Sequence, residues 1–235
     1  MTDPAKPFSL MTDMAPIWLS FRLSLVTTAV LLLIAVPLAN WLAHSRFRLK
    51  VVAETIISLP LVLPPTVLGF YLLLAFSPSN AFGQFLDRYL GLRLVFSFPG
   101  LVIASVLYSL PFMVNPLLAG FRALPSSLRE ASATLGKSGA YTLLNVLLPN
   151  IRGSLLTGIV LSFAHTMGEF GVVLMIGGNI PGKTRVASLA LYDEVQSLNY
   201  HAANRYALIL FASSFMILLL VYLLNHHFSK ANPLP

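Results

Sequence analysis

Five long runs of hydrophobic residues, separated by shorter polar stretches, organise the chain. Each run reaches the roughly 20 residues that a helix needs to cross the hydrocarbon core of a membrane. Strands of a membrane barrel would alternate apolar and polar residues over about ten positions, and these runs are continuous instead. The pattern predicts an all-α integral membrane protein with about five spans, at residues 17–43, 51–77, 98–121, 150–176 and 204–225.

The composition supports this fold class. Hydrophobic residues make up 57% of the 235 residues and charged residues only 10%, whereas a soluble domain has roughly 25% charged residues. A soluble helical bundle of this composition would lack the polar side chains to cover its surface. The first run is longer than a signal-peptide core of about 7–15 residues, so we expect it to be retained as a span.

Charge and cysteine content exclude several other classes. The chain has no cysteine, which excludes disulfides, thiolate metal sites and cysteine nucleophiles. Its net charge of +7 comes from basic residues that flank the apolar runs, of which Arg46, Arg48 and Lys50 form the tightest cluster. Such flanking charge is typical of membrane proteins, so no nucleic-acid partner is expected.

Charge counting does not by itself orient the chain in a membrane. If the loops 44–50 and 122–152 and the C-terminus lie inside, eight Lys and Arg residues are inside and seven are outside. The short basic loop 44–50 favours this orientation. We divide the chain into an N-terminal extracytoplasmic segment, a spanning domain and a cytoplasmic tail, at residues 1–16, 17–225 and 226–235. The connections are expected to hold two short helices, near residues 85–90 and 187–195.

Two of the runs contain prolines. Pro60, Pro64 and Pro65 lie in the middle of the second run, and Pro111 and Pro116 interrupt the third. Each proline removes a helical hydrogen bond and kinks or breaks the helix. A membrane tolerates this where neighbouring helices or a wet cavity satisfy the freed carbonyl groups. Kinks that shape the packing and bends that let a gate open are both compatible with the pattern.

The polar connection at residues 123–149 has helical periodicity but too many polar residues to span. Ser127 and Glu130 have the spacing of a capping box, which predicts a helix start with Glu130 in its first turn. Gly136 is predicted to end this helix as a left-handed C-cap. The apolar side chains expected to share one face of the helix are Leu128, Ala131 and Leu135.

A second helical stretch is predicted from Ser138 to Leu148, and Pro149 is expected to stop it before the next span. The connection is therefore predicted to be a short helix, a glycine bend and a second helix at the membrane surface. Such a rigid projection can dock into a groove of another protein.

The residues of this connection carry a family resemblance. Glu130-Ala131-Ser132, then Gly136, then Val146-x-Leu148-Pro149 resembles the EAA loop of bacterial ABC importer permeases. Ser132 in place of the second alanine and Val146 in place of the usual isoleucine are small departures. The resemblance implies a cytoplasmic coupling helix that enters a cleft of an ATPase subunit, with the N-terminus outside and the C-terminus inside. It implicates in coupling Arg129, Glu130, Ala131, Ser132, Leu135, Gly136, Lys137, Leu148 and Pro149.

Residues 177–184, Gly-Gly-Asn-Ile-Pro-Gly-Lys-Thr, satisfy the phosphate-binding pattern GxxxxGK[ST]. Three observations oppose a nucleotide site. The implied orientation places the loop outside, the chain has no soluble segment large enough for a nucleotide-binding domain, and Pro181 lacks a backbone N–H that a phosphate cradle would use. We therefore expect that this chain does not bind ATP.

The fourth run ends with an acidic residue, Glu169. An acid at the centre of an apolar helix costs about 2.5–3.5 kcal/mol on insertion scales, so it calls for a specific role. It either lines a pathway near an outer gate or hydrogen-bonds to neighbours and fixes the packing, and it would repel an anion. His165 is expected to pack or hydrogen-bond rather than to relay protons. Gly168 and Gly171 are expected to allow close helix contact.

A second resemblance concerns the cargo. Gly168-Glu169-Phe170-Gly171, the turn at residues 179–184 and the proline stretch at residues 59–65 resemble the permeases of the molybdate and sulfate/thiosulfate systems, the molybdate permeases most closely. The likeness covers nearly the whole chain to about Tyr222. The residues expected to serve the pathway, the gate or the packing are Pro60, Pro64, Pro65, Met167, Gly168, Glu169, Phe170, Gly171 and Asn179.

This resemblance implies a homodimer of permeases in the lipid of the cytoplasmic (inner) membrane. It further implies two cytoplasmic ATPase subunits that bind ATP and Mg, and an extracytoplasmic oxyanion-binding protein. The chain itself would bind no cofactor or metal, would have no catalytic site, and would work by alternating access. Two alternatives are a sulfate/thiosulfate permease and a proton-coupled secondary transporter. The latter would use Glu169 and His165, but the chain lacks the internal repeat common in such carriers.

Overall fold

The computed structural model describes residues 13–45 and 48–230, and within these ranges all the regular structure is helical. The predicted segments 1–16 and 226–235 lie partly outside the described residues, and Arg46 lies wholly outside them. The elements are α1 (Ala15–His44), α2 (Lys50–Ser58), the 3₁₀ turn η1 (Leu59–Leu61), α3 (Pro65–Phe76), α4 (Ala81–Leu90), α5 (Phe98–Ala123), α6 (Ser127–Thr134), α7 (Gly139–Thr142), the π-helical turn η2 (Leu143–Leu147), α8 (Leu148–Asn150), α9 (Arg152–Met167), α10 (Gly171–Gly177), α11 (Ala187–Gln196) and α12 (Tyr200–Lys230).

Three helices of the described chain, α1, α5 and α12, are each long and apolar enough to cross a membrane, and two bent pairs raise the number to five. The three match the first, third and fifth hydrophobic runs, although α12 continues to Lys230, beyond the predicted end. Helix α5 begins where the Ser97 hydroxyl accepts a hydrogen bond from the Gly100 N–H at 3.2 Å. Pro111 and Pro116 lie inside α5 without ending it.

The second run is not one straight span. Helix α2 with η1 and helix α3 meet at an angle of 107°. The bend falls at residues 62–64, because Pro64 has extended backbone geometry and Pro65 opens α3 as its first residue. A proline that begins a helix loses no intrahelical bond, so the prolines divide the run into two helices instead of kinking one.

The fourth run is also divided, and the predicted single span at residues 150–176 is wrong in its bounds. Helix α9 ends at Met167, and α10 begins only at Gly171. At its other end, α9 is bent by 85° from the preceding helical segment, with the break at Ile151. Helix α9 counts as a span only together with the bent segment before it, and α10 is a separate short helix.

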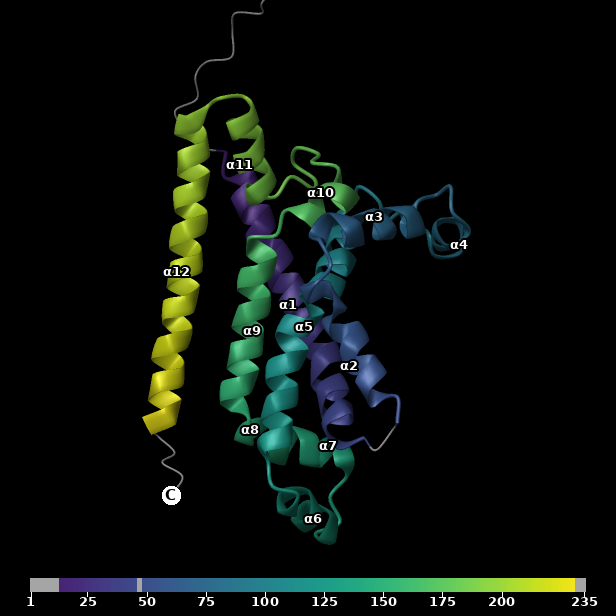
Figure 1. The fold of residues 1–235 in the computed structure, drawn as a ribbon, viewed down its shortest axis with the longest axis vertical. Coiled ribbons are helices and arrows are strands. Elements are labelled where there is room, and N and C mark those ends of the chain that lie inside the picture. Colours follow the sequence, from purple (N-terminus) through teal and green to yellow (C-terminus); the bar gives the residue numbers. More distant parts are fainter. Residues whose placement is uncertain (1–12, 46–47, 231–235) are drawn as a thin grey trace, which may run out of the picture.

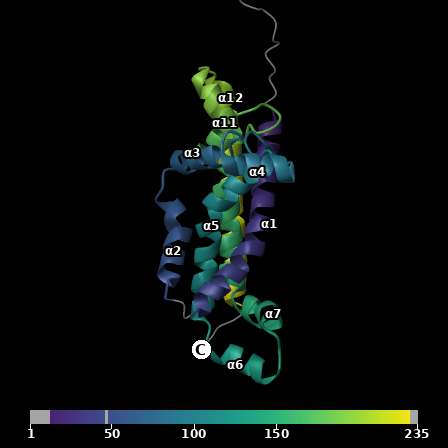
Figure 2. The same cartoon turned by 90° about the vertical axis from the view of Figure 1, so that its right-hand side faces the viewer.

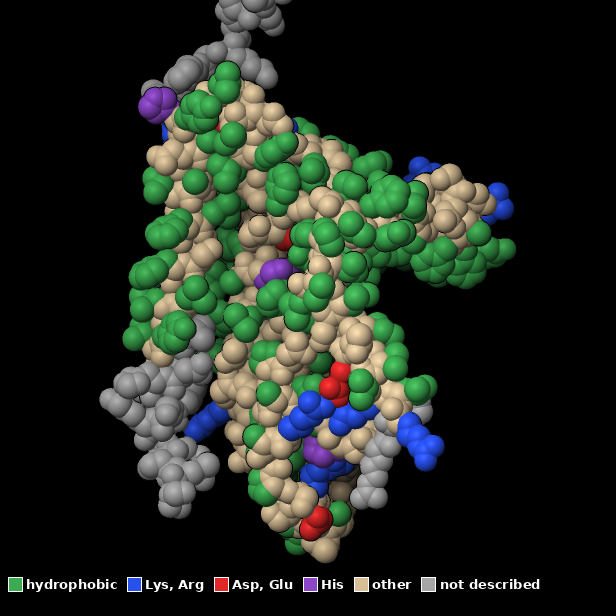
Figure 3. Space-filling model, in the orientation of Figure 1, with side chains coloured by type: hydrophobic (Ala, Val, Ile, Leu, Met, Phe, Trp, Pro, Cys, Tyr) green, Lys and Arg blue, Asp and Glu red, His purple; other side chains and the backbone are tan. Residues whose placement is uncertain are grey.

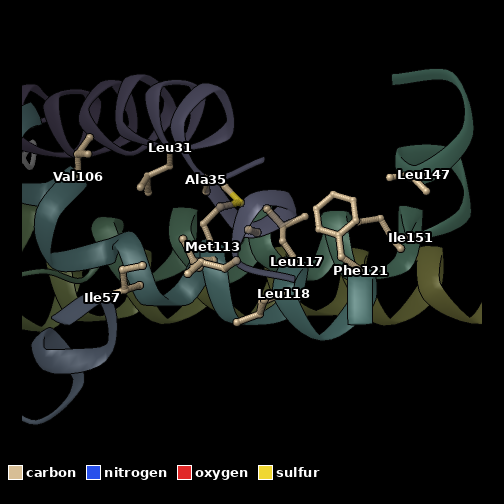
Figure 4. Packing of buried hydrophobic residues seen from close by; sticks show 13 residues of the cluster. Leu31, Ala35, Ile57, Val106, Met113, Leu117, Leu118, Phe121, Leu147 and Ile151 are labelled. Atoms are coloured by element: carbon tan, nitrogen blue, oxygen red, sulfur yellow. The ribbon is translucent and has the colours of Figure 1, made fainter. Parts of the chain in front are cut away.

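The buried apolar side chains form two clusters along α1 and α5. One cluster runs from Leu31 to Ile151 and includes Met113 and Phe121, which are almost fully buried. Figure 4 shows the Phe121 ring beside Ile151, with Leu147 close by. Lipid is as apolar as these side chains, so close packing, rather than escape from water, holds the helices together.

A small residue permits the closest approach of α5 and α9. A Cβ atom on Gly120 would lie 2.6 Å from the Ser154 hydroxyl oxygen and 3.2 Å from the Ile151 Cβ. Real Cβ atoms do not tolerate the shorter of these distances, so a larger residue would force the two helices apart. Small residues at helix contacts are typical of membrane bundles.

The molecule has two distinct ends (Figures 1 and 2). Helices α6 and α7 lie at one end, together with the C-terminal end of α12, and α10 and α11 lie at the opposite end. Helices α3 and α4 form an arm that projects sideways from the bundle near the α11 end. Hydrophobic side chains cover α12, whereas Lys and Arg side chains gather toward the α6 end (Figure 3).

Candidate functional site

The helical projection at the α6 end begins differently from the sequence prediction. Ser127 is the first helical residue, and Ser126 precedes it with no side-chain capping bond. The predicted capping box at Ser127 is therefore wrong. Glu130 does lie in the first turn of α6, where a negative charge is favourable near the N-terminal end of the helix dipole.

The glycine bend after α6 is built as predicted. Gly136 has a φ of +68°, and its N–H donates to the Ala133 carbonyl at 2.9 Å, while the Lys137 N–H donates to the Ser132 carbonyl at 3.1 Å. These two bonds define a Schellman cap, which requires a left-handed residue at the glycine position. A side chain at residue 136 would meet no other atom within 4 Å, so the backbone angle, not space, demands glycine.

The two halves of the projection are joined by side chains. The hydroxyl groups of Ser132 and Thr142 lie 2.7 Å apart, and both residues are buried. Helix α7 begins at a Ser138 cap, whose hydroxyl accepts from the Tyr141 N–H at 3.2 Å. The Lys137 ammonium lies over the Tyr141 ring, 4.9 Å from its centroid. Helices α6 and α7 therefore form one firm unit instead of two loose segments.

The end of the second stretch differs from the prediction. Pro149 does not stop the helix but lies inside α8, and the break comes two residues later at Ile151. Helix α8 follows η2 without a break, so Pro149 lies within one helical segment at residues 139–150. A membrane-protein helix can accommodate a proline where a neighbouring turn widens locally. The five residues before α8 form a π-helical turn, a wider turn that is often found at functional sites.

One face of the projection is exposed and the other is attached to the core. Leu128 and Leu148 pack against the buried cluster that contains Leu147. Ala131 is exposed, and Leu135 has 75% of its surface exposed, so the predicted shared apolar face is wrong because only Leu128 turns inward. The outward face also presents further exposed residues predicted for coupling, namely Arg129, Glu130, Gly136, Lys137 and Pro149.

Two cavities lie beside Arg129, which lines both of them. The first, of about 390 Å³, is also lined by His44, Arg122 and Glu130. The second, of about 410 Å³, is also lined by Lys137. Arg122 forms an ion pair with Glu54 of α2. Charged residues thus line the cavities beside the projection, and an ion pair ties α5 to α2.

At the other end, Glu169 is buried in the break between α9 and α10, with 5% of its surface exposed. Its Oε2 accepts a hydrogen bond from the Ser105 hydroxyl of α5 at 3.0 Å. Its backbone carbonyl accepts from the Ser188 hydroxyl of α11. Its Oε1 has no partner among the described residues. Glu169 thus connects three helices, and these contacts fit a residue that fixes helix packing.

Residues close to Glu169 also contact other helices. The His165 Nδ1 and the Ser109 hydroxyl lie 2.9 Å apart, and the His165 ring stacks on Phe112 with centroids 4.0 Å apart. A Cβ on Gly171 would lie 2.7 Å from the Pro65 Cβ, so the expected close contact at Gly171 is confirmed. The same expectation for Gly168 is wrong, because there a Cβ would lie 3.8 Å from Ala164 of the same helix.

The remaining residues predicted for the pathway are placed around this break. Met167 is buried, and the Phe170 ring lies 5.1 Å from the Tyr192 ring of α11, measured between centroids. Pro65 meets Gly171, which brings the end of the second run to the break in the fourth. Pro60 and Pro64 lie at the bend between α2 and α3.

In the turn with the phosphate-binding pattern, backbone N–H groups are hydrogen-bonded within the turn itself. The N–H groups of Lys183, Thr184 and Arg185 all donate to the Ile180 carbonyl, at 3.1, 2.9 and 3.0 Å. The Thr184 hydroxyl donates to the Gly177 carbonyl at 2.6 Å and accepts from the Ile180 N–H at 3.0 Å. A phosphate cradle needs such N–H groups to point outward, so this turn lacks the donors of a nucleotide site.

Asn179 belongs to the same turn, with a φ of +54°. Its amide donates to the Asp193 carboxylate at 2.9 Å, and its oxygen accepts from Arg185 at 3.2 Å. Arg185 and Asp193 also form an ion pair at 3.0 Å. These contacts attach the turn to α11, as expected of a packing residue. Among the described residues, no three His, Asp or Glu side chains come together as metal ligands.

Sequence reasoning missed the serines that hold the polar cluster. Ser105 and Ser109 lie one turn apart on α5, and they meet Glu169, in the break after α9, and His165, four residues earlier in α9. This matched spacing of polar residues in two apolar runs is a signal that was available in the sequence. Ser188 gave no such signal, because it meets a backbone carbonyl and not a side chain.

The chain is similar to known proteins over most of its length. Residues 23–231 match the family described as "Binding-protein-dependent transport system inner membrane component". The chain belongs to this family. The all-helical fold and the hydrophobic, membrane-spanning helices agree with an inner membrane component.

The relatives of the chain include permease proteins of molybdenum and sulfate transport systems. The molybdenum transport system permease protein ModB of Azotobacter vinelandii is 46% identical over 211 residues, which cover 89% of this chain and 93% of that protein. The sulfate transport system permease protein CysT of Salmonella typhimurium is 32% identical over 189 residues, 80% of this chain and 68% of that one.

A solved structure shares the fold. The MetNI methionine ABC transporter, in an inward-facing conformation, matches with a TM-score of 0.71 over 97% of this chain and 99% of that chain. The sequence identity is 15%, so this likeness bears on the fold alone. It agrees with the predicted fold class, an all-α ABC importer permease.

Proposed function

We propose that this chain is the membrane-spanning permease of an ABC importer that carries molybdate or tungstate across the cytoplasmic membrane. Membership of the family supports the class of protein. The 46% identity to ModB, over most of both chains, carries the proposal on the cargo. The 32% identity to CysT supports a sulfate/thiosulfate permease as the second candidate.

The proposed partners are a second copy of the chain, two cytoplasmic ATPase subunits and an extracytoplasmic binding protein. We propose that ATP and Mg bind only to the ATPase subunits and that this chain has no catalytic site. The exposed outward face of α6 and its Schellman cap support a docking role for the residues 127–150. Because α6 is capped and is hydrogen-bonded to α7, the two helices can move as one rigid unit when a partner displaces them.

We propose that the α6 end faces the cytoplasm, so that the N-terminus is outside and the C-terminus inside. The Lys and Arg side chains that gather toward this end support the orientation (Figure 3). On this proposal the closed turn at residues 177–184 faces outward.

The proposed mechanism is alternating access driven by the partner ATPases. Closure of the ATPase dimer would displace the projection, and the attachment of Leu128 and Leu148 to the core would pass this movement to α1 and α5. Helix α9 is broken from its neighbours at Ile151 and at residues 168–170, so it can tilt between these two points. Glu169 and His165 would hold α5 and α9 together as the pathway opens and closes.

The cargo is tested by uptake into proteoliposomes that hold the chain with its ATPase and its binding protein. The proposal expects ATP-driven uptake of molybdate and tungstate, with a 100-fold excess of sulfate competing poorly. Isothermal titration of the same binding protein with the three anions supplies the independent reading of affinity. Uptake of sulfate in preference to molybdate would replace the first candidate by the second.

The orientation is tested separately, because the chain has no native cysteine. Leu135→Cys and Lys183→Cys place single thiols at exposed positions of the two ends. In right-side-out vesicles, a membrane-impermeant maleimide should label position 183 and leave position 135 unlabelled until the vesicles are opened. The reverse labelling would contradict the proposed orientation.

A further inference from the structure

Helix α4 is amphipathic and stands apart from the bundle on the arm that it forms with α3 (Figure 1). One face of α4 carries Phe82, Phe85 and Tyr89, and half or more of the surface of each is exposed. Given the helical spacing, Gln84 lies opposite this face and Arg88 lies at its polar edge. An exposed aromatic face of this kind is expected to contact a partner protein or lipid.

The orientation of α4 on the arm is fixed. A Cβ on Gly83 would lie 2.0 Å from the Ser77 carbonyl oxygen, so the backbone of α4 packs directly on the end of α3. Arg93 forms an ion pair with Asp87 at 3.0 Å, which ties the segment after α4 back to the helix. The aromatic face therefore keeps one direction relative to the bundle.

That direction matches the plane of a membrane. Because α3 is bent by 107° from α2, the arm runs across the direction of the spans. Figure 3 shows hydrophobic side chains on the lower side of the arm, turned toward the level of the spans, and Lys and Arg side chains at its upper and outer edge. A helix that lies in the membrane plane, with its apolar side inward and its charges outward, has the geometry of an interfacial helix.

We propose that α4 lies in the membrane–water interface on the α11 side and inserts Phe82, Phe85 and Tyr89 into that leaflet of the lipid bilayer. Aromatic rings favour the headgroup level because they join an apolar body to a polar rim. Arg88 lies at the water side of α4, where a guanidinium can reach lipid phosphates while its stem covers apolar surface. This proposal concerns lipid contact and does not depend on the cargo or on the orientation proposed above.

Lipid is favoured over a soluble protein occupant by the distribution of charge on the arm. The exposed side of α3 carries Phe70, Tyr71 and Leu74, so both helices of the arm expose apolar side chains. A soluble partner that approaches from the α11 end would meet the charged edge of the arm, not its aromatic face (Figure 3). The arm therefore extends the lipid-facing surface of the spans.

The test uses spin labels, since a chain without cysteine accepts a single label at a chosen residue. Phe85→Cys and Tyr89→Cys place labels on the aromatic face, Gln84→Cys places a matched label on the opposite face, and Arg88→Cys places one at the polar edge. The labelled full-length chain, in complex with its ATPase, is reconstituted into vesicles of phosphatidylethanolamine and phosphatidylglycerol. Collision rates are then measured with oxygen, which concentrates in the bilayer, and with a water-soluble nickel chelate.

The proposal expects oxygen collisions to dominate at positions 85 and 89, at a depth of about 5–10 Å below the phosphates. Nickel collisions should dominate at positions 84 and 88. Low rates with both reagents at 85 and 89 would mean that a second protein surface covers the aromatic face, and would overturn the proposal. Dominant nickel collisions there would place the face in water and would overturn it as well. If Phe85→Cys does not insert, a label at Phe82→Cys tests the same face.

Discussion

Thr184 offers the sharpest test of the turn at residues 177–184, because a phosphate site and a structural cap predict different results. Its side chain is fully buried, and its hydroxyl bridges the Gly177 carbonyl and the Ile180 N–H. Thr184→Val keeps the shape and removes the hydroxyl. The substitution therefore leaves two backbone groups without their partner and fills the same space.

The size of the effect follows from these two groups. A buried donor or acceptor left unsatisfied costs about 1–3 kcal/mol, so the two groups together give about 2–6 kcal/mol. Ile180 is half-buried, and its freed N–H can reach water. We therefore expect the lower part of this range, about 2–3 kcal/mol of unfolding free energy. Thr184→Ser keeps the hydroxyl, and the smaller loss should come from its missing methyl group alone, about 1 kcal/mol.

The assay is reversible unfolding of the purified chain in mixed detergent micelles, followed by the loss of helical circular dichroism. Thr184→Val should lower the free energy of unfolding more than Thr184→Ser. The exposed Lys183 provides the contrast, since Lys183→Ala should leave both stability and uptake unchanged. A stability of Thr184→Val equal to that of Thr184→Ser would refute the bridging role of the hydroxyl. If the unmodified chain alone bound ATP and Lys183→Ala abolished that binding, the turn would be a phosphate site and not a structural cap.

Three further substitutions test the packing. Gly69→Ala should cost about 1–3 kcal/mol of unfolding free energy by overpacking. The new Cβ would lie 2.8 Å from the Met175 Cβ, across the contact of α3 and α10. A change near zero would contradict that contact. Ser105→Ala should cost about 1–3 kcal/mol in the same assay, because a buried carboxylate oxygen loses its donor; unchanged stability would show that the bond is not made. Arg122→Ala should cost less than about 1 kcal/mol, because its ion pair with Glu54 is half-exposed and solvent-screened, and a larger loss would indicate a buried pair.

The hydrophobic pattern was sufficient to predict the fold class and the three long helices. A run of apolar residues specifies a span through its length alone, which is why α1, α5 and α12 fall where the sequence places them. It does not specify where a span breaks. Pro111 lies inside the unbroken α5, whereas Pro65 opens a new helix at a bend of 107°. The outcome depends on the neighbouring helices, which the local sequence does not describe.

Only part of the projection could be predicted from the sequence. The left-handed Gly136 was predictable, because the Schellman cap depends on a local backbone angle that glycine alone adopts readily. The capping box at Ser127 was wrong because the start of a helix can shift by one residue. The end at Pro149 was wrong because a proline can lie within a helix beside a widened π-helical turn. The partners of Glu169 needed the contact of α5 with α9, which no local pattern supplies.

We propose that residues 127–150 couple this permease to its ATPase. This proposal is tested most directly by ATP-driven molybdate uptake in proteoliposomes that hold the chain, its ATPase and its binding protein. Glu130→Lys reverses an exposed charge in the first turn of α6, and Gly136→Asp strains the left-handed cap. Gly139→Ala is the matched control, because a Cβ there meets nothing within 4 Å.

Each variant is first checked for membrane insertion and helical content, so that a failure to fold is not taken for a failure to couple. We expect Glu130→Lys and Gly136→Asp to insert normally and to lose uptake by at least about 10-fold, because both alter the surface proposed to dock on the ATPase. The Gly139→Ala control should transport like the unmodified chain. Full molybdate uptake by both coupling variants would contradict the claim.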